Sequence, residues 1–343
     1  MVDFQRAFIN SYNLLLRDKQ IIFPALASMI VIILLITLAL YSTGFLSLFR
    51  EFYSSYEAFL GQKSSYIKDT GNMRNADYPM EMFKYMASEY TSNDFYEEDF
   101  DEFLQGSESG LAEKAASVFS FRNIVLLNVF VAIGMLAIIY FGAMSSEVVA
   151  LAMNKKNIGF LDVIKATNAV FFRYFLYILI TSLIFALPIL FLLLISVLLS
   201  VINPVFVLVG VLLFLGYAVY AVFFGLKLYF SIPALFVDNL PAVASLKKSF
   251  SITKGKIGMV FFVYGVTYAT SFVVSSFGLE PLVSSYANVL LSSNILTVFV
   301  SALLVILFFA LGAVAFTFLT IFQFYMYVEF KNMVKVDDKS KIA

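Results

Sequence analysis

The sequence predicts an all-α fold: a polytopic bundle of six transmembrane helices, with amphipathic interfacial helices and a helical extracytoplasmic insertion. Three observations lead to this prediction. Hydrophobic residues make up 61% of the 343 residues and charged residues only 13%, with a mean hydropathy of +0.90, far from the usage of soluble proteins. Six apolar runs are each long enough to cross a bilayer, and basic connections alternate with one acidic section and two short connections that lack Lys and Arg.

Composition excludes several kinds of chemistry. The chain contains no Cys and no His, which rules out disulfides, thiolate nucleophiles, Ser-His-Asp triads and most zinc sites. The formal net charge is zero, so no general basic surface points to nucleic acid. We therefore expect no catalytic residue, no cofactor and no metal site.

Residues 1–20 form an amphipathic pattern ahead of the first apolar run. Phe4, Phe8, Tyr12 and Leu15 recur at helical spacing among polar neighbours, which predicts a cytoplasmic interfacial helix. The first span follows at 21–44, and its uncharged part, Ile21–Tyr41, would be about 30 Å long as a helix. This run is too long for a cleaved signal sequence with so weak a cleavage site, so we expect it to be retained.

Residues 45–121 form the large hydrophilic section of the chain. Aromatic residues at helical spacing and a strong excess of acidic residues predict an acidic, extracytoplasmic helical insertion. A cluster of carboxylates within it could hold a divalent cation, but the spacing matches no EF-hand loop and the turn glycine is missing, which favours a solvated acidic helix face. The cluster comprises Asp94, Glu97, Glu98, Asp99, Asp101 and Glu102.

The remaining segments are predicted from apolar runs and the breaks between them. In order, they are a second span at 122–146, a cytoplasmic connector with a surface helix at 147–173, a hairpin of the third and fourth spans at 174–230, a surface-helix motif at 231–256, a hairpin of the fifth and sixth spans at 257–327 and a basic cytoplasmic tail at 328–343. Pro188 falls inside the third span, where it is expected to kink the helix.

Basic residues set the predicted topology. Three Lys or Arg precede the first span, four lie in the second connector, five lie between Lys227 and Lys256 and four lie in the tail, whereas the two short opposite connections have none. The positive-inside rule then places both termini in the cytoplasm and the acidic insertion outside. We expect a multi-pass protein of the cytoplasmic membrane of a prokaryote.

The densest polar pattern is Ile232–Gly255, which we interpret as a helix on the membrane surface. Pro233 is expected to end the preceding apolar helix, Asp238 or Asn239 to accept the free N–H groups of the next one, Pro241 to lie in its first turn, and Gly255 to end it. An apolar stripe is expected from Val243, Leu246, Phe250 and Ile252.

Four lysines gather near the end of this helix: Lys247, Lys248, Lys254 and Lys256. They could bind anionic lipid headgroups, at about 1 kcal/mol each. Alternatively, they only fix the orientation of the chain in the membrane.

A weak internal repeat links the connectors. Gly159–Thr167 can be placed over Pro241–Ser249, and residues 4–20 follow the same plan. This pattern predicts three units, each a surface helix followed by a transmembrane hairpin, with 45–121 inserted in the first. The alternative is chance similarity among amphipathic helices.

The pattern Pro-Ala-Leu-Phe-Val-Asp-Asn at 233–239, with Ala244, Lys247, Ser249, Thr253 and Gly255, resembles a family of prokaryotic six-span membrane proteins of unknown function. That family is related to the membrane domain of glycerophosphoryl diester phosphodiesterases. The resemblance implies the fold over the membrane region. The soluble phosphodiesterase domain, with its catalytic His and metal-binding carboxylates, has no counterpart in these 343 residues, so that activity is not implied.

The span interiors contain no Asp, Glu, Lys or Arg, which are the residues that usually mark ion pathways. We expect a non-enzymatic integral membrane protein that acts in envelope organisation, lipid interaction or membrane-complex assembly. Its partners would be the lipid bilayer, anionic lipids included, and a membrane or cytoplasmic protein. The alternative is a transporter or permease subunit for a neutral or amphiphilic solute, which a polar cavity lined by Thr267, Ser271 and Gln323 would favour. An intramembrane hydrolase is disfavoured by the missing His and Cys.

Overall fold

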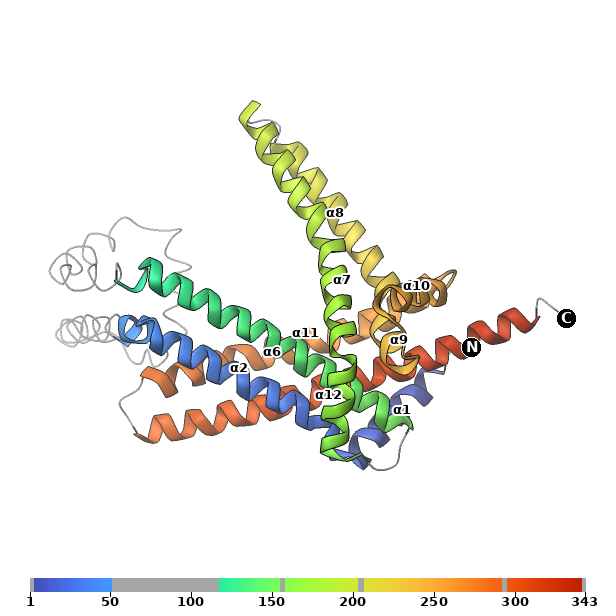
Figure 1. Cartoon of the computed structure of the whole chain (residues 1–343), viewed down its shortest axis with the longest axis horizontal. Helices are drawn as coiled ribbons and strands as arrows, with labels where there is room; N and C mark the ends of the chain where they lie inside the picture. Colours follow the sequence, from blue (N-terminus) through green and yellow to red (C-terminus); the bar gives the residue numbers. More distant parts are fainter. Residues whose placement is uncertain (1–2, 51–116, 155–157, 203–206, 292–294, 341–343) are drawn as a thin grey trace, which may run out of the picture. The chain divides into compact units, whose positions relative to one another are not determined.

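The computed structural model describes residues 3–50, 117–154, 158–202, 207–291 and 295–340 (Figure 1). These residues form helices joined by short connections and contain no strand, which confirms the predicted all-α fold for this part of the chain. The helices are α1 (Phe4–Arg17), the 3-10 helix η1 (Lys19–Ile22), α2 (Phe23–Ser42), α6 (Phe121–Asn154), α7 (Phe160–Ile202), α8 (Val207–Leu228), α9 (Ser231–Val237), α10 (Ala242–Thr253), α11 (Ile257–Leu291) and α12 (Ile295–Ser340).

Within the described residues, five helical segments are long and apolar enough to cross a membrane, which is typical of a multi-pass membrane protein. They are Lys19–Ser42, Phe121–Asn154, Phe160–Leu198, Leu208–Val237 and Leu296–Val334. The predicted fifth span corresponds to a shorter apolar segment of α11, Ile257–Phe272.

The chain divides into two compact units. Unit 1 comprises Met1–Met29, Leu136–Ser275 and Leu311–Ala343, and unit 2 comprises Ile30–Met135 and Ser276–Ala310. Each unit combines segments that are far apart in the sequence.

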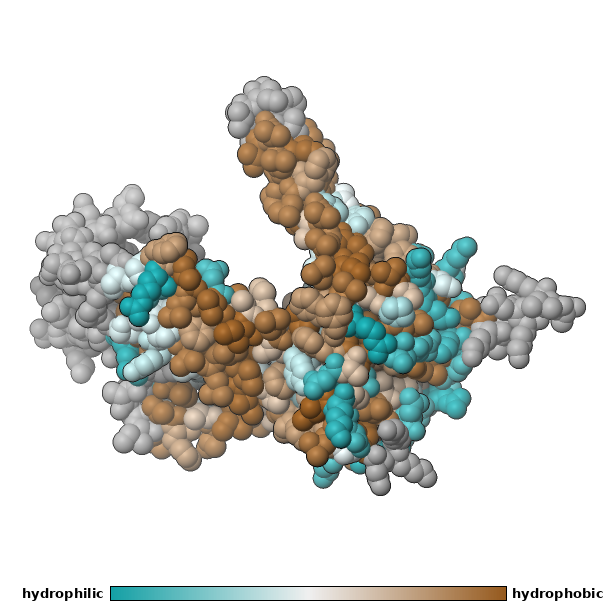
Figure 2. Space-filling view, viewed as in Figure 1, coloured by the Kyte–Doolittle hydropathy of each residue, from teal (hydrophilic) through white to brown (hydrophobic). Residues whose placement is uncertain are grey.

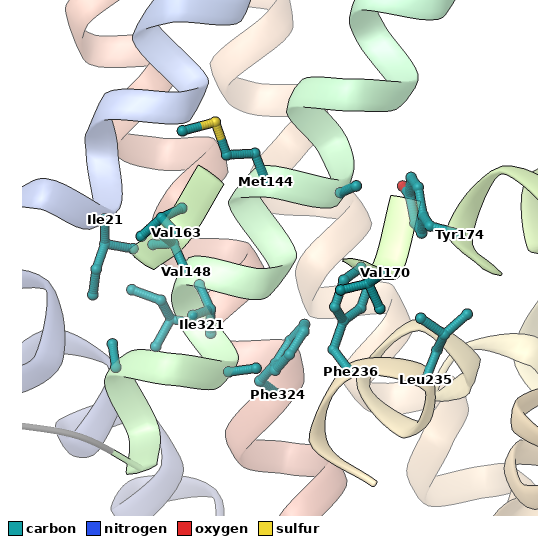
Figure 3. Close-up of a cluster of buried hydrophobic side chains, with 14 of the residues drawn as sticks. Ile21, Met144, Val148, Val163, Val170, Tyr174, Leu235, Phe236, Ile321 and Phe324 are labelled. Carbon is teal, nitrogen blue, oxygen red and sulfur yellow. The ribbon is translucent and has the colours of Figure 1, made fainter. Parts of the chain in front are cut away.

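Unit 1 has two cores of buried apolar side chains, and both use α9 and α12. In the first, Phe236 of α9 packs near Phe324 of α12, with ring centroids 6.5 Å apart, and close to Tyr174 of α7, at 5.5 Å (Figure 3). In the second, Phe230 packs on Phe330 of α12 at 5.0 Å. Burying aromatic side chains of this size dominates the energetics of a core, so α9 is firmly fixed despite its seven residues.

Unit 2 joins the two ends of the inserted section. The Asn123 side-chain amide of α6 donates to the carbonyls of Thr43 and Ser117, at 3.0 Å each, and the rings of Phe45 and Phe119 meet edge to face. The predicted helical insertion and its acidic cluster lie mostly in 51–116, outside the described residues.

Several predicted boundaries differ from the structure. No separate surface helix occurs in the described part of the 147–173 connector, because α7 runs unbroken from Phe160 to Ile202. The buried residues of its first turns, Val163, Thr167 and Val170, lie on the same helix face as Tyr174 and Tyr177. One continuous helix can therefore bury all of them. In the predicted hairpin of the fifth and sixth spans, α11 stays helical up to Leu291, and the predicted tail is helical up to Ser340.

Pro188 lies inside α7 and has no N–H to donate to the carbonyl of Ile184. Two tyrosine hydroxyls of α8 bond to this turn: Tyr220 Oη donates to the Ile184 carbonyl at 3.2 Å, and Tyr217 Oη to the Phe185 carbonyl at 3.0 Å. Donors from the neighbouring helix therefore satisfy the backbone groups that the proline disturbs.

Candidate functional site: the α9–α10 turn

The residues of the polar motif begin at a helix break. α8 ends at Leu228 and α9 begins at Ser231, leaving Tyr229 and Phe230 between them. Pro233 lies in the first turn of α9, where the N–H groups have no partner within the helix and a proline is tolerated. The prediction that Pro233 ends the preceding helix is therefore wrong, because the break falls earlier and Pro233 belongs to the start of the next helix.

Side chains from other elements bond the backbone at this break. Ser249 Oγ of α10 accepts from the Phe230 N–H at 3.2 Å and donates to the Lys227 carbonyl at 2.6 Å. Gln323 Nε2 of α12 donates to the Tyr229 carbonyl. Phe230 is fully buried, and an unbonded backbone group there would be costly, so α10 and α12 stabilise the break.

Asp238 follows α9 directly and faces α12. Its Oδ2 accepts from Tyr327 Oη at 2.7 Å, and its Oδ1 pairs with Lys331 Nζ at 2.5 Å. Pro241 is the N-cap residue of α10, and no side chain caps that helix. The prediction that Asp238 accepts the first N–H groups of the helix is therefore wrong. Its carboxylate instead takes two partners one helical turn apart on α12, an ammonium among them, and charge-assisted bonds of this kind are the stronger ones.

Asn239 and Pro241 shape the turn. Asn239 has a φ of 53°, a left-handed conformation that Asn tolerates better than most residues, and its carbonyl accepts from Arg173 Nη1 at 3.1 Å. The prediction that Asn239 caps the helix is therefore wrong as well. Pro241 has a φ of −66° but lies one position before the first turn of α10. Gly255, with a φ of +73°, follows the end of α10, which confirms the predicted helix end.

The buried face of α10 is more polar than predicted. Leu246 and Ile252 are buried as expected, whereas Val243 is 50% exposed. Ser245, Ser249 and Thr253 are fully buried at four-residue spacing. Small hydroxyl residues at this spacing let helices approach closely, and the sequence itself carries this spacing.

The four lysines differ in exposure. Lys247 and Lys254 are exposed, and Lys248 is half-buried. Lys256 is half-buried too, and its Nζ is inaccessible to solvent. The predicted lipid-contact set is therefore reduced to Lys247 and Lys254, with Lys248 beside them.

The same positions are buried in the three segments of the predicted repeat. When the three segments are aligned on Ser11, Thr167 and Ser249, each of these residues has a hydroxyl side chain and no exposed surface. The full sets are Ala7, Ser11 and Leu14 in α1, Val163, Thr167 and Val170 in α7, and Ser245, Ser249 and Ile252 in α10. Helices buried on one side share this spacing of three and four residues, so the repeat stays a prediction.

Two arginines occupy one position of this repeat, and sequence reasoning missed their role. Arg17 Nη2 donates to the Ala152 carbonyl near the end of α6 at 3.0 Å, just as Arg173 donates to Asn239 after α9. Cations suit the carbonyl ends of helices, so each arginine ties its segment to a helix end. Asp3 was missed too: its side chain accepts from the Arg6 N–H and caps α1.

The turn is suited to holding helix ends together rather than to acid–base chemistry. Both carboxylate oxygens of Asp238 already have partners on α12. Among the residues that the structure describes, no group of three or more His, Cys, Asp or Glu could hold a metal ion.

Scans against protein-family models, curated proteins and solved structures found no match to this chain. The resemblance of Pro233–Gly255 to a six-span membrane family therefore stays a prediction.

Proposed function

We propose that this chain is a non-enzymatic, six-span protein of a prokaryotic cytoplasmic membrane, with both termini in the cytoplasm. It acts in envelope organisation by binding lipids or by assembling with a membrane partner. Six apolar runs in the sequence support the span count, and the distribution of Lys and Arg supports the orientation.

The pairing of both Asp238 oxygens with α12 is the observation that carries the proposal. A general acid or base needs a proton position open to a substrate. Asp238 instead has Tyr327 on one oxygen and Lys331 on the other, while Arg173 is bonded to the Asn239 carbonyl. The charged groups of the turn therefore bond α7 and α12 to the end of α9, which is a structural role.

The second candidate, a transporter, is favoured by the helix break between α8 and α9. Broken helices border substrate sites in many transporters. Two of the three side chains expected to line a polar cavity lie at the break: Thr267 shares a 2.9 Å hydrogen bond with Tyr229 Oη, and Gln323 bonds the Tyr229 carbonyl. The third, Ser271, bonds the carbonyl of Thr267 in its own helix. Because these groups already bond within the chain, the non-transport function remains the better supported one.

Native mass spectrometry and reconstitution separate the two functions. We expect the full chain, extracted in mild detergent, to retain lipid or a stoichiometric protein partner. Proteoliposomes should show no saturable uptake across a panel of neutral and amphiphilic solutes, with protein-free liposomes as the control. Saturable uptake would overturn the proposal in favour of transport.

Labelling tests the six-span topology. Tags placed between Ile202 and Val207, and between Leu291 and Ile295, should be reached from outside the cell, because the short connections there lack basic residues. Tags at the two termini should be protected. A cytoplasmic signal at either connection contradicts the topology.

A further inference from the structure

The three repeat segments expose the same positions but carry different side chains there. In α1 two of these positions hold Ile9, 45% exposed, and Leu16, 58% exposed, whereas in α10 they hold the exposed Lys247 and Lys254. The full exposed sets are Gln5, Ile9, Asn13 and Leu16 in α1, Leu161, Lys165, Ala169 and Phe172 in α7, and Val243, Lys247 and Ser251 in α10 with its C-cap residue Lys254. Both positions therefore hold a lysine in the α10 segment, whereas α7 has a lysine at the first position and α1 has none.

We propose that the exposed face of α10, formed by Lys247, Ser251 and Lys254, binds the headgroups of anionic phospholipids. This inference rests on the proposed function and names its lipid partner.

The membrane segments on both sides hold α10 close to the bilayer. The membrane-spanning candidate Leu208–Val237 ends five residues before Ala242, and the apolar segment Ile257–Phe272 begins four residues after Thr253. A bilayer surface is therefore the partner within reach of this face. In Figure 2 hydrophilic surface gathers over the α9–α10 end of the α7–α8 hairpin, whose length is mostly hydrophobic.

Charge complementarity favours anionic over zwitterionic lipid. Between Ser231 and Lys256 the one acidic residue is Asp238, and its carboxylate is engaged by Lys331 and Tyr327. Lys247 and Lys254, the C-cap residue of α10, are seven residues apart, which is about 10 Å along the helix axis. Two ammonium groups on one exposed face, with the Ser251 hydroxyl between them, match phosphate oxygens as acceptors.

A native mass spectrometry titration of the full chain with phosphatidylglycerol and phosphatidylcholine tests this proposal. Each lysine near an anionic surface contributes a factor of about five in affinity. We expect Lys247→Gln with Lys254→Gln to weaken phosphatidylglycerol binding about 25-fold and to leave phosphatidylcholine binding unchanged. The difference between wild type and variant should largely vanish at about 1 M salt, where the screening length is about 3 Å.

Two matched variants serve as controls for the position and for the charge of the lysines. Lys165→Gln removes the same charge from the equivalent exposed position of α7 and should leave phosphatidylglycerol binding within about two-fold of wild type. Lys247→Arg with Lys254→Arg keeps both charges and should retain binding. The melting temperature in detergent verifies folding of each variant.

Unchanged phosphatidylglycerol binding in the double Gln variant, or an equal loss in Lys165→Gln, overturns the lipid assignment. The former result points to an acidic protein partner for this face. Either result leaves the proposed function standing, because that function is tested by solute uptake and by the labelling of its connections.

Discussion

The first turns of α7 and the helix α10 bury the same face and then take different courses. Val163, Thr167 and Val170 of α7 correspond to Ser245, Ser249 and Ile252 of α10, yet α7 continues into a spanning helix and α10 ends at Thr253. In the same alignment Arg173, inside α7, corresponds to Gly255, which has a φ of +73°. A buried face thus permits either a surface helix or the start of a span, and in α10 a residue with left-handed φ follows the end of the helix.

The buried hydroxyl of the two segments also differs in its partners. Thr167 Oγ1 donates to the Val163 carbonyl of its own helix at 2.8 Å, a bond that adds no contact between elements. Ser249 Oγ bonds Phe230 and Lys227 across the α8–α9 break. At the same position of the alignment, the hydroxyl therefore bonds within its own helix in α7 and links two helices in α10.

The largest expected effect comes from removing the linking hydroxyl. Ser249→Ala leaves the Phe230 N–H and the Lys227 carbonyl unbonded in a buried site, so we expect a loss of about 2–4 kcal/mol. Thr167→Val, of similar shape, removes only a bond within one helix and should cost less than about 1 kcal/mol. Denaturant unfolding in detergent measures both, and equal losses would contradict the comparison.

The next largest loss of stability is expected from breaking the ion pair between Asp238 and Lys331. Asp238→Ala removes the carboxylate and leaves Lys331, partly shielded from solvent, without its anion, so we expect a loss of about 1–3 kcal/mol. Asn239→Ala affects a residue whose bond uses the backbone and should cost less, mainly through its left-handed φ. A double-mutant cycle of Asp238→Ala with Lys331→Ala should give a coupling of about 0.5–3 kcal/mol. A coupling near zero would show that α9 and α12 do not depend on this pair.

The smallest effect tests the residue that ends α10. Gly255→Arg introduces the residue found in α7, and because a Cβ there meets no atom within 4 Å, the cost is conformational, about 1–2 kcal/mol for a left-handed φ. Gly258→Ala, two residues into α11 and equally open, should instead be neutral or stabilising by about 0.5–1 kcal/mol. The same unfolding assay measures both, and a neutral Gly255→Arg would indicate that a different residue ends α10.

Sequence patterns predicted the features that depend on residues close together in the sequence. The apolar runs predicted the all-α fold, and Gly255 marked a helix end because left-handed φ is a local requirement. The partners of Asp238 could not be predicted, since Tyr327 and Lys331 lie about 90 residues further along the chain. Without that contact, a carboxylate before an amphipathic helix is typical of a cap. The unbroken course of α7 was missed for a related reason, because the amphipathic pattern of a surface helix and the first turns of a buried span share one period.

The proline in α7 bears on the stability of the α7–α8 hairpin in the membrane. The carbonyls of Ile184 and Phe185 receive their donors from Tyr220 and Tyr217, which are synthesised later, on α8. The Ile184 carbonyl has no N–H donor within α7, and a carbonyl without a donor in the hydrocarbon core costs several kcal/mol, so the bonds from α8 stabilise α7 in lipid. The hairpin of α7 and α8 is therefore more stable in the bilayer than the two helices are apart.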